Sequence, residues 1–183
     1  MREAELRLTK GELRYLVVVY ELGKGGELVK ASEVACRLNV KSPSAVEALE
    51  KLSKLGLVIY FKRKGVKITK RGMEEVLRYY RRHRILETLL VTHLNMDLDE
   101  ACREARNIDA YVSDDLINRV CKLLGHPRKC PHGYDIPPSS ECCGTALVSE
   151  EEVTTIAAER SREVNDERPC KPSGSPDNTY TPP

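Results

Sequence analysis

The 183-residue chain carries 30 Lys and Arg against 28 Asp and Glu, a formal net charge of only +2. The charge is unevenly placed, because residues 1–84 have a net charge of +10 and residues 85–183 a net charge of −8. A basic first half predicts a polyanionic partner for that half alone. The sequence contains neither an apolar run of the roughly 20 residues that a membrane helix needs nor a secretory signal. We therefore expect a cytoplasmic protein with no membrane partner.

The first part of the sequence predicts three short helices, over residues 9–22, 31–38 and 43–55. The first helix opens at Thr9 and Glu12, which have the spacing of a capping box. The third helix is expected to use Ser42 as its N-cap and to place Pro43 at its first position, where proline is favoured.

A basic hairpin is predicted to follow the third helix. Residues 57–61 and 66–69 have the composition of strands, and a tip of Lys62, Arg63 and Lys64 joins them. Three helices and a basic hairpin are the pattern of a winged helix-turn-helix, in which the third helix reads the DNA major groove and the wing contacts phosphates. The residues expected nearest to double-stranded DNA are Lys41, Ser42, Pro43, Ser44, Glu47, Lys51, Lys62, Arg63 and Lys64. Winged helices also serve as protein-docking modules, which is the alternative.

Residues 69–94 predict one long helix with a buried apolar stripe. His83 and Glu87 occupy that stripe and lie one helical turn apart on the same face. A carboxylate facing a core is unfavourable unless a cation or a strong donor meets it. The pair is therefore a candidate for binding a metal, with a buried histidine–carboxylate hydrogen bond as the alternative.

The acidic second half predicts two further helices, which begin after Asp97 and Ser113. The second of these helices has a broad apolar face for so small a unit. A self-complementary dimer surface is one use for that face, and dimerisation suits a repressor that reads two half-sites. Alternatively, the face could be buried in the core of a monomeric three-helix unit. The residues of this face are Leu116, Ile117, Val120, Leu123 and Leu124.

Seven cysteines, an odd number in a chain without a secretory signal, argue against a disulfide framework. Four potential metal ligands, Cys130, His132, Cys142 and Cys143, lie within fourteen residues of one another in a Pro- and Cys-rich loop. Such a set predicts a tetrahedral zinc site or, through its cysteines, an iron–sulfur cluster. A purely structural turn at Cys130 and His132 is the alternative.

These elements predict a mostly α-helical protein in three parts. Residues 1–72 form a winged helix-turn-helix, a long connector helix leads into a helical metal-binding and dimerisation domain over residues 73–140, and residues 141–183 contain a Cys-containing loop, a short helix at 149–164 and a disordered tail. No glycine-rich phosphate loop and no nucleophile–base pair is recognisable, so an enzyme is not expected.

Several segments, in this order, carry a resemblance to a known family: YLVVVYEL, ASEVACRLNVKSPSAVEALEKLSKLGLV, GVKITKRG, RRHRILETLL, DEACREA and CPHGYDIP. Over residues 8–138 the sequence resembles the diphtheria-toxin-repressor/manganese-transport-regulator family of metal-dependent transcriptional repressors. The resemblance implies a homodimer in which bound Fe²⁺ or Mn²⁺ orients the winged domains on operator DNA. The C-terminal third domain of the longer members is not recognisable.

The resemblance also implies ligands for two metal sites. The family's ancillary site falls on His83, Glu87 and Cys102, where Cys102 replaces a residue that is usually histidine. Thiolate and imidazole both bind transition metals, although thiolate shifts the preference towards softer ions.

The family's primary site is degenerate in this sequence. Its ligand positions fall on Arg14, Val17, Arg106, Asp109 and Ala110, of which only Asp109 retains ligand chemistry. Our hypothesis is that Arg106 replaces the primary metal with a fixed charge that pairs with Asp109 or Glu104. A regulator that is independent of metal, or that senses redox state through the cysteines, is therefore a second alternative.

Overall fold

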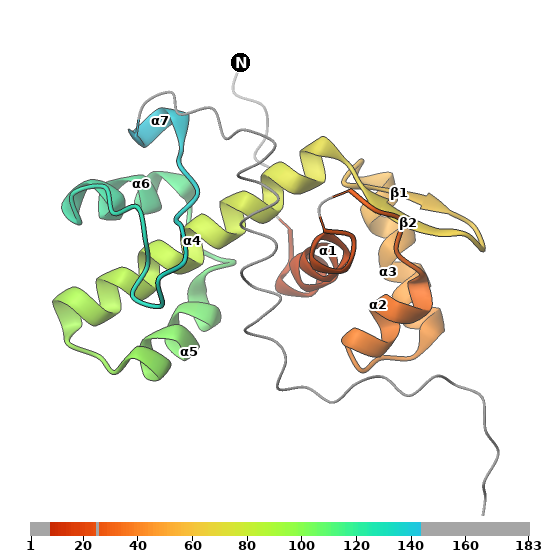
Figure 1. Cartoon of the computed structure of the whole chain (residues 1–183), viewed down its shortest axis with the longest axis horizontal. Coiled ribbons are helices and arrows are strands. Elements are labelled where there is room, and N and C mark those ends of the chain that lie inside the picture. Colours follow the sequence, from red (N-terminus) through yellow and green to blue (C-terminus); the bar gives the residue numbers. More distant parts are fainter. Residues whose placement is uncertain (1–7, 25, 144–183) are drawn as a thin grey trace, which may run out of the picture.

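The structure is a computed structural model in which residues 8–24 and 26–143 are described, and it has two lobes joined by one long helix (Figure 1). This arrangement confirms the predicted winged helix-turn-helix and the helical second half. The described residues include no helix with the length and apolar character needed to cross a membrane. The elements are α1 (Lys10–Leu22), α2 (Ala31–Arg37), α3 (Ser42–Lys54), β1 (Val58–Phe61), β2 (Gly65–Ile68), α4 (Lys70–Leu94), α5 (Leu98–Ile108), α6 (Asp114–Leu123) and α7 (Ser140–Cys143).

The first lobe contains α1 to α3 and the antiparallel hairpin of β1 and β2, in which Val58 pairs with Ile68. The predicted capping box is present, because the Thr9 side chain accepts a hydrogen bond from the Glu12 backbone and the Glu12 carboxylate accepts one from the Thr9 backbone. The prediction of Ser42 as N-cap is wrong by one residue. Ser42 is already helical, and Lys41, with extended dihedral angles, takes the cap position.

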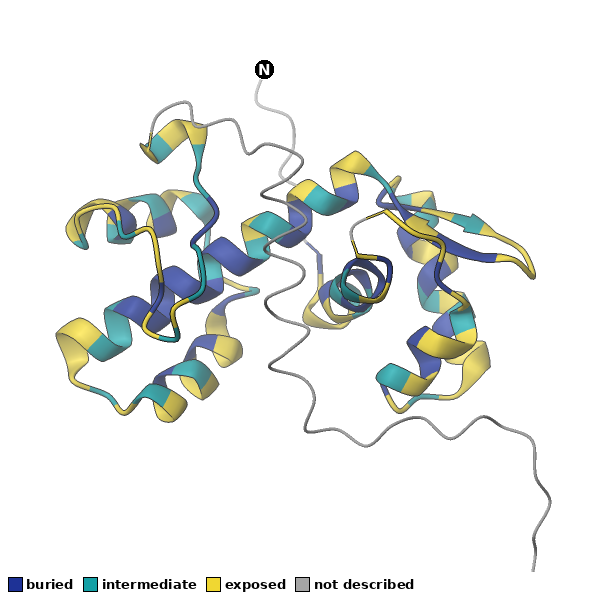
Figure 2. Ribbon diagram, viewed as in Figure 1, coloured by how far each residue is buried: buried dark blue, intermediate teal, exposed yellow. Residues whose placement is uncertain are grey.

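Helix α4 belongs to both lobes, and most of its middle is buried (Figure 2). It begins after Thr69, whose hydroxyl accepts from the Gly72 backbone and donates to the Leu57 carbonyl. A Cβ on Gly72 would lie 2.1 Å from that carbonyl oxygen, so glycine is needed for this close approach. The first turns of α4 add Val76 to the core of the winged lobe, and the later turns enter a second core. The predicted domain boundary at residue 72 thus falls inside a continuous helix.

The second lobe packs α5 and α6 against the C-terminal half of α4. Asp97 and Ser113 cap α5 and α6 as predicted, each accepting backbone hydrogen bonds at the helix start. After α6 the chain returns along α4 through an ordered turn, in which Lys129 and Asp135 form an antiparallel β-bridge. The described part of the chain then reaches α7. Helix α7 lies in the segment that the sequence predicted as a loop. The predicted helix at 149–164 and the tail lie outside the described residues.

Candidate metal centre and nucleic-acid interface

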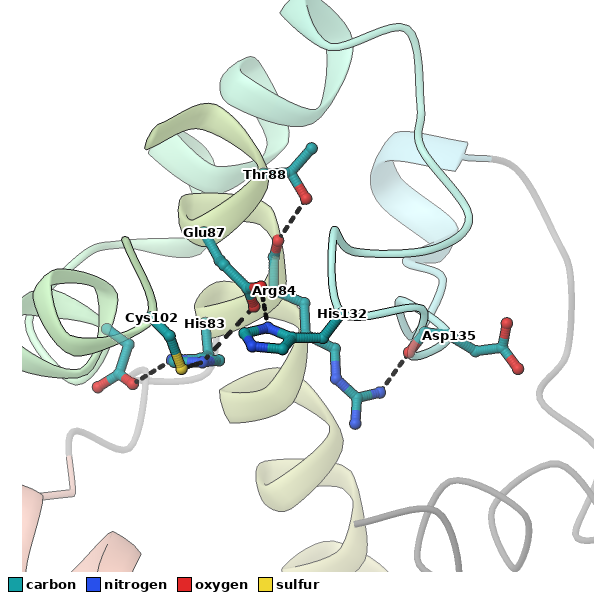
Figure 3. Close-up of polar contacts among 8 residues, drawn as sticks. His83, Arg84, Glu87, Thr88, Cys102, His132 and Asp135 are labelled. Carbon is teal, nitrogen blue, oxygen red and sulfur yellow. Dashed lines mark hydrogen bonds and ion pairs between the residues drawn. The ribbon is translucent and has the colours of Figure 1, made fainter. Parts of the chain in front are cut away.

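Three predicted metal ligands meet around the ring of His83 (Figure 3). Its Nε2 atom lies 3.6 Å from Cys102 Sγ and 3.8 Å from Glu87 Oε2. Its Nδ1 atom lies 3.2 Å from Asp109 Oδ2, and both side chains are buried. A carboxylate that holds one ring nitrogen and leaves the other facing a set of donors is the usual arrangement around a metal-binding histidine.

The second oxygen of Glu87 meets a residue from a distant segment. His132, from the turn after α6, contacts Glu87 Oε1 through its Nδ1 atom. Glu87, Cys130 and His132 have ligand atoms that all lie within 4.8 Å of one another. Burial raises the pKa of the Cys130 thiol, and the charge of Glu87 raises it further. His132 and Glu87 also line the cavity described below, whereas Cys130 does not.

A cavity of about 10 Å³ lies among these side chains and is lined by His83, Arg84, Glu87, Cys102, Arg106, His132 and Tyr134. That volume is about the minimum for one water molecule, so the cavity fits a single small species. We refer to His83, Glu87, Cys102, Cys130 and His132 together as the Glu87 centre. Its donors combine imidazole, carboxylate and thiolate, a mixed set that suits a divalent transition metal.

Two arginines border the cavity and oppose the binding of a cation. Arg84 is 3% exposed, donates to the Asp135 carbonyl and lies over the rings of Tyr80 and Tyr134, 5.1 and 5.4 Å from their centroids. Arg106 is exposed at the rim. Negative charge on Glu87, and on a thiolate at Cys102, is therefore needed to make the cavity attractive to a dication.

The hypothesis that Arg106 pairs with an acid is wrong in one respect. The Asp109 carboxylate contacts His83, and among the described residues Arg106 forms no ion pair with Asp109 or Glu104. Asp109 is 1% exposed, whereas Arg106 is exposed at the rim of the cavity. Asp109 therefore serves the candidate ancillary site by orienting His83. A carboxylate three residues after Arg106 gave no sequence signal for this role.

The structure divides the four-ligand loop that the sequence predicted. Cys130 and His132 join Glu87, whereas Cys142 and Cys143 lie with Cys121 and His126 at the far end of α6. The expectation of one site within the loop is wrong, because the turn that places His132 on α4 directs the following residues towards α6. Sequence reasoning missed Cys121 and His126 as partners, although the five-residue spacing between them could have indicated a pair at a helix end.

The thiols of this second group differ in acidity. Burial raises the pKa of Cys121 to about 11. Burial also opposes ionisation of Cys143, but the hydrogen bonds of Cys143 with His126 and the Ser139 backbone, together with the charge of Arg81, lower its pKa to about 7. We refer to Cys121, His126, Cys142 and Cys143 as the Cys121 cluster.

All nine residues predicted to lie near DNA are exposed in the winged lobe. Lys41 to Ser44 form the start of α3, and Lys62 to Lys64 form the turn that projects beyond β1 and β2 (Figure 1). Lys51 differs from the others because its Nζ atom lies 2.8 Å from Glu12 Oε1. The hydrogen bond from Lys51 lowers the pKa of Glu12. Because Lys51 is paired with a carboxylate of its own lobe, its charge is partly neutralised before any DNA phosphate is bound.

Comparisons with known proteins agree with both parts of this arrangement. Residues 7–66 match the iron dependent repressor N-terminal DNA binding domain. Residues 69–138 match the iron dependent repressor metal binding and dimerisation domain. An uncharacterized HTH-type transcriptional regulator of Aeropyrum pernix is 31% identical over 150 residues, which are 74% of this chain and 82% of that protein. The chain belongs to the iron-dependent repressor family.

Some relatives are longer than this chain. The iron-dependent repressor IdeR of Mycobacterium tuberculosis is 27% identical over 123 residues, covering 67% of this chain and 54% of that protein. The structure of the manganese regulator SloR shares 34% identity and a TM-score of 0.61, covering 78% of this chain and 65% of that chain. This chain therefore spans about half the length of the first of these curated relatives.

The two candidate sites differ in their relation to the family match. Every residue of the Glu87 centre lies between residues 69 and 138, inside the iron-dependent repressor metal binding and dimerisation domain. Cys142 and Cys143 lie beyond the end of that match. Half of the Cys121 cluster is therefore outside the part of the chain that matches the family domains.

Proposed function

We propose that this protein is a homodimeric transcriptional regulator, acting as a repressor, whose affinity for operator DNA depends on Fe²⁺ or Mn²⁺ bound at the Glu87 centre. The observation that carries the proposal is the convergence of donors from three separate segments on one cavity beside α4. His83 and Glu87 come from α4 itself, Cys102 from α5, and His132 from the turn after α6. A divalent ion held there would join these three segments through electrostatic and coordination bonds.

The path from this centre to the DNA-binding lobe runs along α4. One turn before Arg84, the Tyr80 ring packs edge-on against Tyr20 of α1, with centroids 6.2 Å apart. The Tyr80 hydroxyl donates to Glu21 Oε1 at 3.1 Å. Any change in how α4 packs against α5 therefore moves a helix to which α1 is attached. This attachment supports coupling between the metal-binding residues and the orientation of the wing.

Two surfaces support the proposed partners. The exposed lysines and arginine of α3 and the wing suit the phosphates of double-stranded DNA, and Glu47 can accept from cytosine N4. On α6, Leu116 and Leu123 are 47% and 65% exposed, whereas Ile117 is buried against α4. Part of the predicted apolar face is thus exposed to solvent in the single chain, and we propose that it contributes to the homodimer interface.

The deciding experiment is an anaerobic titration of a fluorescent duplex from the upstream region of the gene itself. Chelated protein is compared with protein given Fe²⁺ or Mn²⁺, and each series is repeated at several salt concentrations. We expect tight binding only with metal, and an affinity that falls steeply with salt because phosphate contacts release counterions. Equal affinity with and without metal would refute the metal dependence. A flat salt dependence would instead favour a protein-docking role for the winged lobe.

A further inference from the structure

The Cys121 cluster gathers three thiols and one imidazole at the C-terminal end of α6. Cys121 lies in the last turns of α6, His126 follows that helix, and Cys142 and Cys143 end α7. Their four ligand atoms all lie within 4.8 Å of one another. None of the three cysteines is paired in a disulfide. The function proposed above uses none of these four residues.

The distances within the cluster match the edges of a small tetrahedron. Cys121 Sγ lies 3.8 Å from Cys143 Sγ, and His126 Nδ1 lies 3.6, 3.7 and 3.6 Å from the sulfurs of Cys121, Cys142 and Cys143. Zinc binds thiolate at about 2.3 Å and imidazole at about 2.0–2.1 Å, so a tetrahedral site has sulfur–sulfur edges of about 3.8 Å and sulfur–nitrogen edges of about 3.5 Å. Four of the six edges in the structure agree with these values, and the other two are no longer than 4.8 Å.

Hydrogen bonding alone does not account for this arrangement. A single ring nitrogen has one proton or one lone pair, so His126 Nδ1 forms a full hydrogen bond with only one of the three sulfurs around it. The further contacts of Cys142 with the Asn118 carbonyl and of Cys143 with Arg81 do not explain why all three sulfurs converge on this nitrogen. One ion at the centre would satisfy all four groups at once. The ligands of a polynuclear iron–sulfur cluster bind different iron atoms and must lie farther apart than this compact set allows.

The backbone directs His126 towards the cysteines. Gly125 and His126 both have positive φ angles, 73° and 59°, and the His126 amide donates to the Cys121 carbonyl at 2.9 Å. Left-handed dihedral angles are uncommon for a residue other than glycine. They reverse the chain at the end of α6 and bring the imidazole over the last turn of that helix.

We propose that Cys121, His126, Cys142 and Cys143 bind one zinc ion as a closed structural site. Three thiolates and one imidazole complete the four-coordinate shell that structural zinc prefers, with no position left for a water or substrate. Arg81 supports the site electrostatically, since its Nη2 atom lies 3.7 Å from Cys143 Sγ. The Cys142 thiol donates to the Asn118 carbonyl at 3.4 Å and would lose this proton on binding zinc. This site does not depend on the regulatory function proposed above.

The site would fasten α7 to α6 and so hold both ends of the segment between them. That segment carries His132, which contacts Glu87, and Pro137, whose carbonyl accepts from Arg81 Nη1 at 3.0 Å. Zinc at the Cys121 cluster therefore fixes the position from which His132 reaches the Glu87 centre. Structural and regulatory metals would then be bound by different residues of the same lobe.

The test uses the full chain, purified under reducing conditions without chelator. Zinc is measured by inductively coupled plasma mass spectrometry and by native mass spectrometry after dialysis, and we expect one zinc ion per chain. Replacement of zinc by Co²⁺ should give the intense visible bands of a tetrahedral cobalt site and a thiolate-to-cobalt charge-transfer band. A reduced, folded chain that holds no zinc and shows no such bands overturns the proposal.

Matched variants identify the ligands. Cys142→Ser/Cys143→Ser should lose the zinc and the cobalt bands, whereas Glu87→Gln and Cys130→Ser should keep both. Cys143 is exposed, so the single variant Cys143→Ser tests the site without a large effect on packing. Zinc retained in the double variant, or lost from Cys130→Ser in its place, overturns the assignment. A second readout is hydrogen exchange at the amides of Cys142 and Cys143, which donate to the Ser139 carbonyl and should exchange at least tenfold faster once zinc is removed.

Discussion

The Glu87 centre and the Cys121 cluster lie in the same lobe but differ in almost every property that decides how a metal is used. The Glu87 centre draws its donors from α4, α5 and a turn, mixes nitrogen, oxygen and sulfur, and surrounds a cavity with two arginines at its wall. The Cys121 cluster draws on α6, α7 and the residue just beyond α6, is dominated by sulfur, and reaches the surface at His126 and Cys143. Mixed donors that join distant segments suit an exchangeable ion, whereas a sulfur-rich closed set suits a permanent one.

Cysteine and histidine spacing along the chain therefore does not by itself define a site. Cys130 and Cys142 belong to one short segment, yet they face different elements. What separates them is the turn at Cys130–Asp135, which directs His132 to α4 before the chain turns back to α6.

Replacing the central carboxylate should affect only one of the two sites. Glu87→Gln keeps the shape of the side chain but removes its charge, and two arginines then face the cavity without it. We expect the affinity for Mn²⁺ to fall on the order of 100-fold, because loss of a direct ligand should cost at least as much as loss of a supporting contact. Isothermal titration calorimetry measures this change. Unaltered Mn²⁺ affinity would show that the ion binds elsewhere.

Removing the carboxylate behind His83 should have a smaller effect of the same kind. Asp109→Asn leaves the ligands in place but weakens the contact that orients His83, and we expect a loss of about tenfold in Mn²⁺ affinity. The same titration measures it, and Asp109→Glu should recover part of the affinity. If Asp109→Asn instead abolished folding, circular dichroism would reveal it and Asp109 would have a structural role.

Restoring the family's usual ligand should change the preference of the Glu87 centre among metals. Cys102→His replaces a soft thiolate with an imidazole, so we expect several-fold weaker binding of Zn²⁺ relative to Mn²⁺ at this centre. Competition between the two ions, followed by Mn²⁺ electron paramagnetic resonance, measures the ratio. An unchanged ratio would show that Cys102 is not a ligand, despite its 3.6 Å distance from His83.

Changes in the wing should weaken DNA binding without affecting metal binding. Lys62→Ala removes one expected phosphate contact, which should reduce the slope of log affinity against log salt by about one. Lys122→Ala, an exposed lysine on α6, is the matched control and should leave the slope unchanged. Fluorescence anisotropy at several salt concentrations measures both. Equal slopes for the two variants would place the wing away from the phosphates.

The smallest effect concerns the ion pair between Glu12 and Lys51. The pKa of Glu12 is lowered in the folded protein, so its ionised form stabilises the fold above the ordinary pKa of a glutamate, and this contribution disappears as the pH falls through the lowered value. Glu12→Gln should therefore cause a small fall in the urea midpoint at pH 7, as expected for an exposed pair, and none in acid. A difference that persisted in acid would indicate loss of the capping box instead.

Much of the fold could be predicted from local signals. Thr9, Thr69, Asp97 and Ser113 mark helix starts because their side chains satisfy the first backbone amides, and these signals require no tertiary context. The cap position at Ser42 was wrong by one residue because proline is tolerated throughout the first helical turn, where its missing amide leaves no intrahelical hydrogen bond unmade, so Pro43 does not fix the exact start. Helix α7 was missed because a four-residue helix has almost no periodicity to detect.

The site was less predictable, since its contacts join residues far apart in the chain. His83 and Glu87 could be paired from their spacing, because a helix fixes which residues share a face. The contacts of Asp109 with His83 and of His132 with Glu87 span 26 and 45 residues and depend on how the helices pack. No spacing rule covers such separations, which is why the partners of Cys142 and Cys143 were also assigned wrongly.

The sharing of α4 between the two cores has a consequence for folding. Val76 and Tyr80 are completely buried and complete the core of the winged lobe, although they lie in the helix that also supports α5 and α6. A fragment that ends at residue 72 would lack both side chains, so the winged lobe should not be stable as an independent unit. The two lobes should therefore unfold in one cooperative transition, and occupancy of the Glu87 centre should raise the melting temperature of the DNA-binding lobe as well as its own.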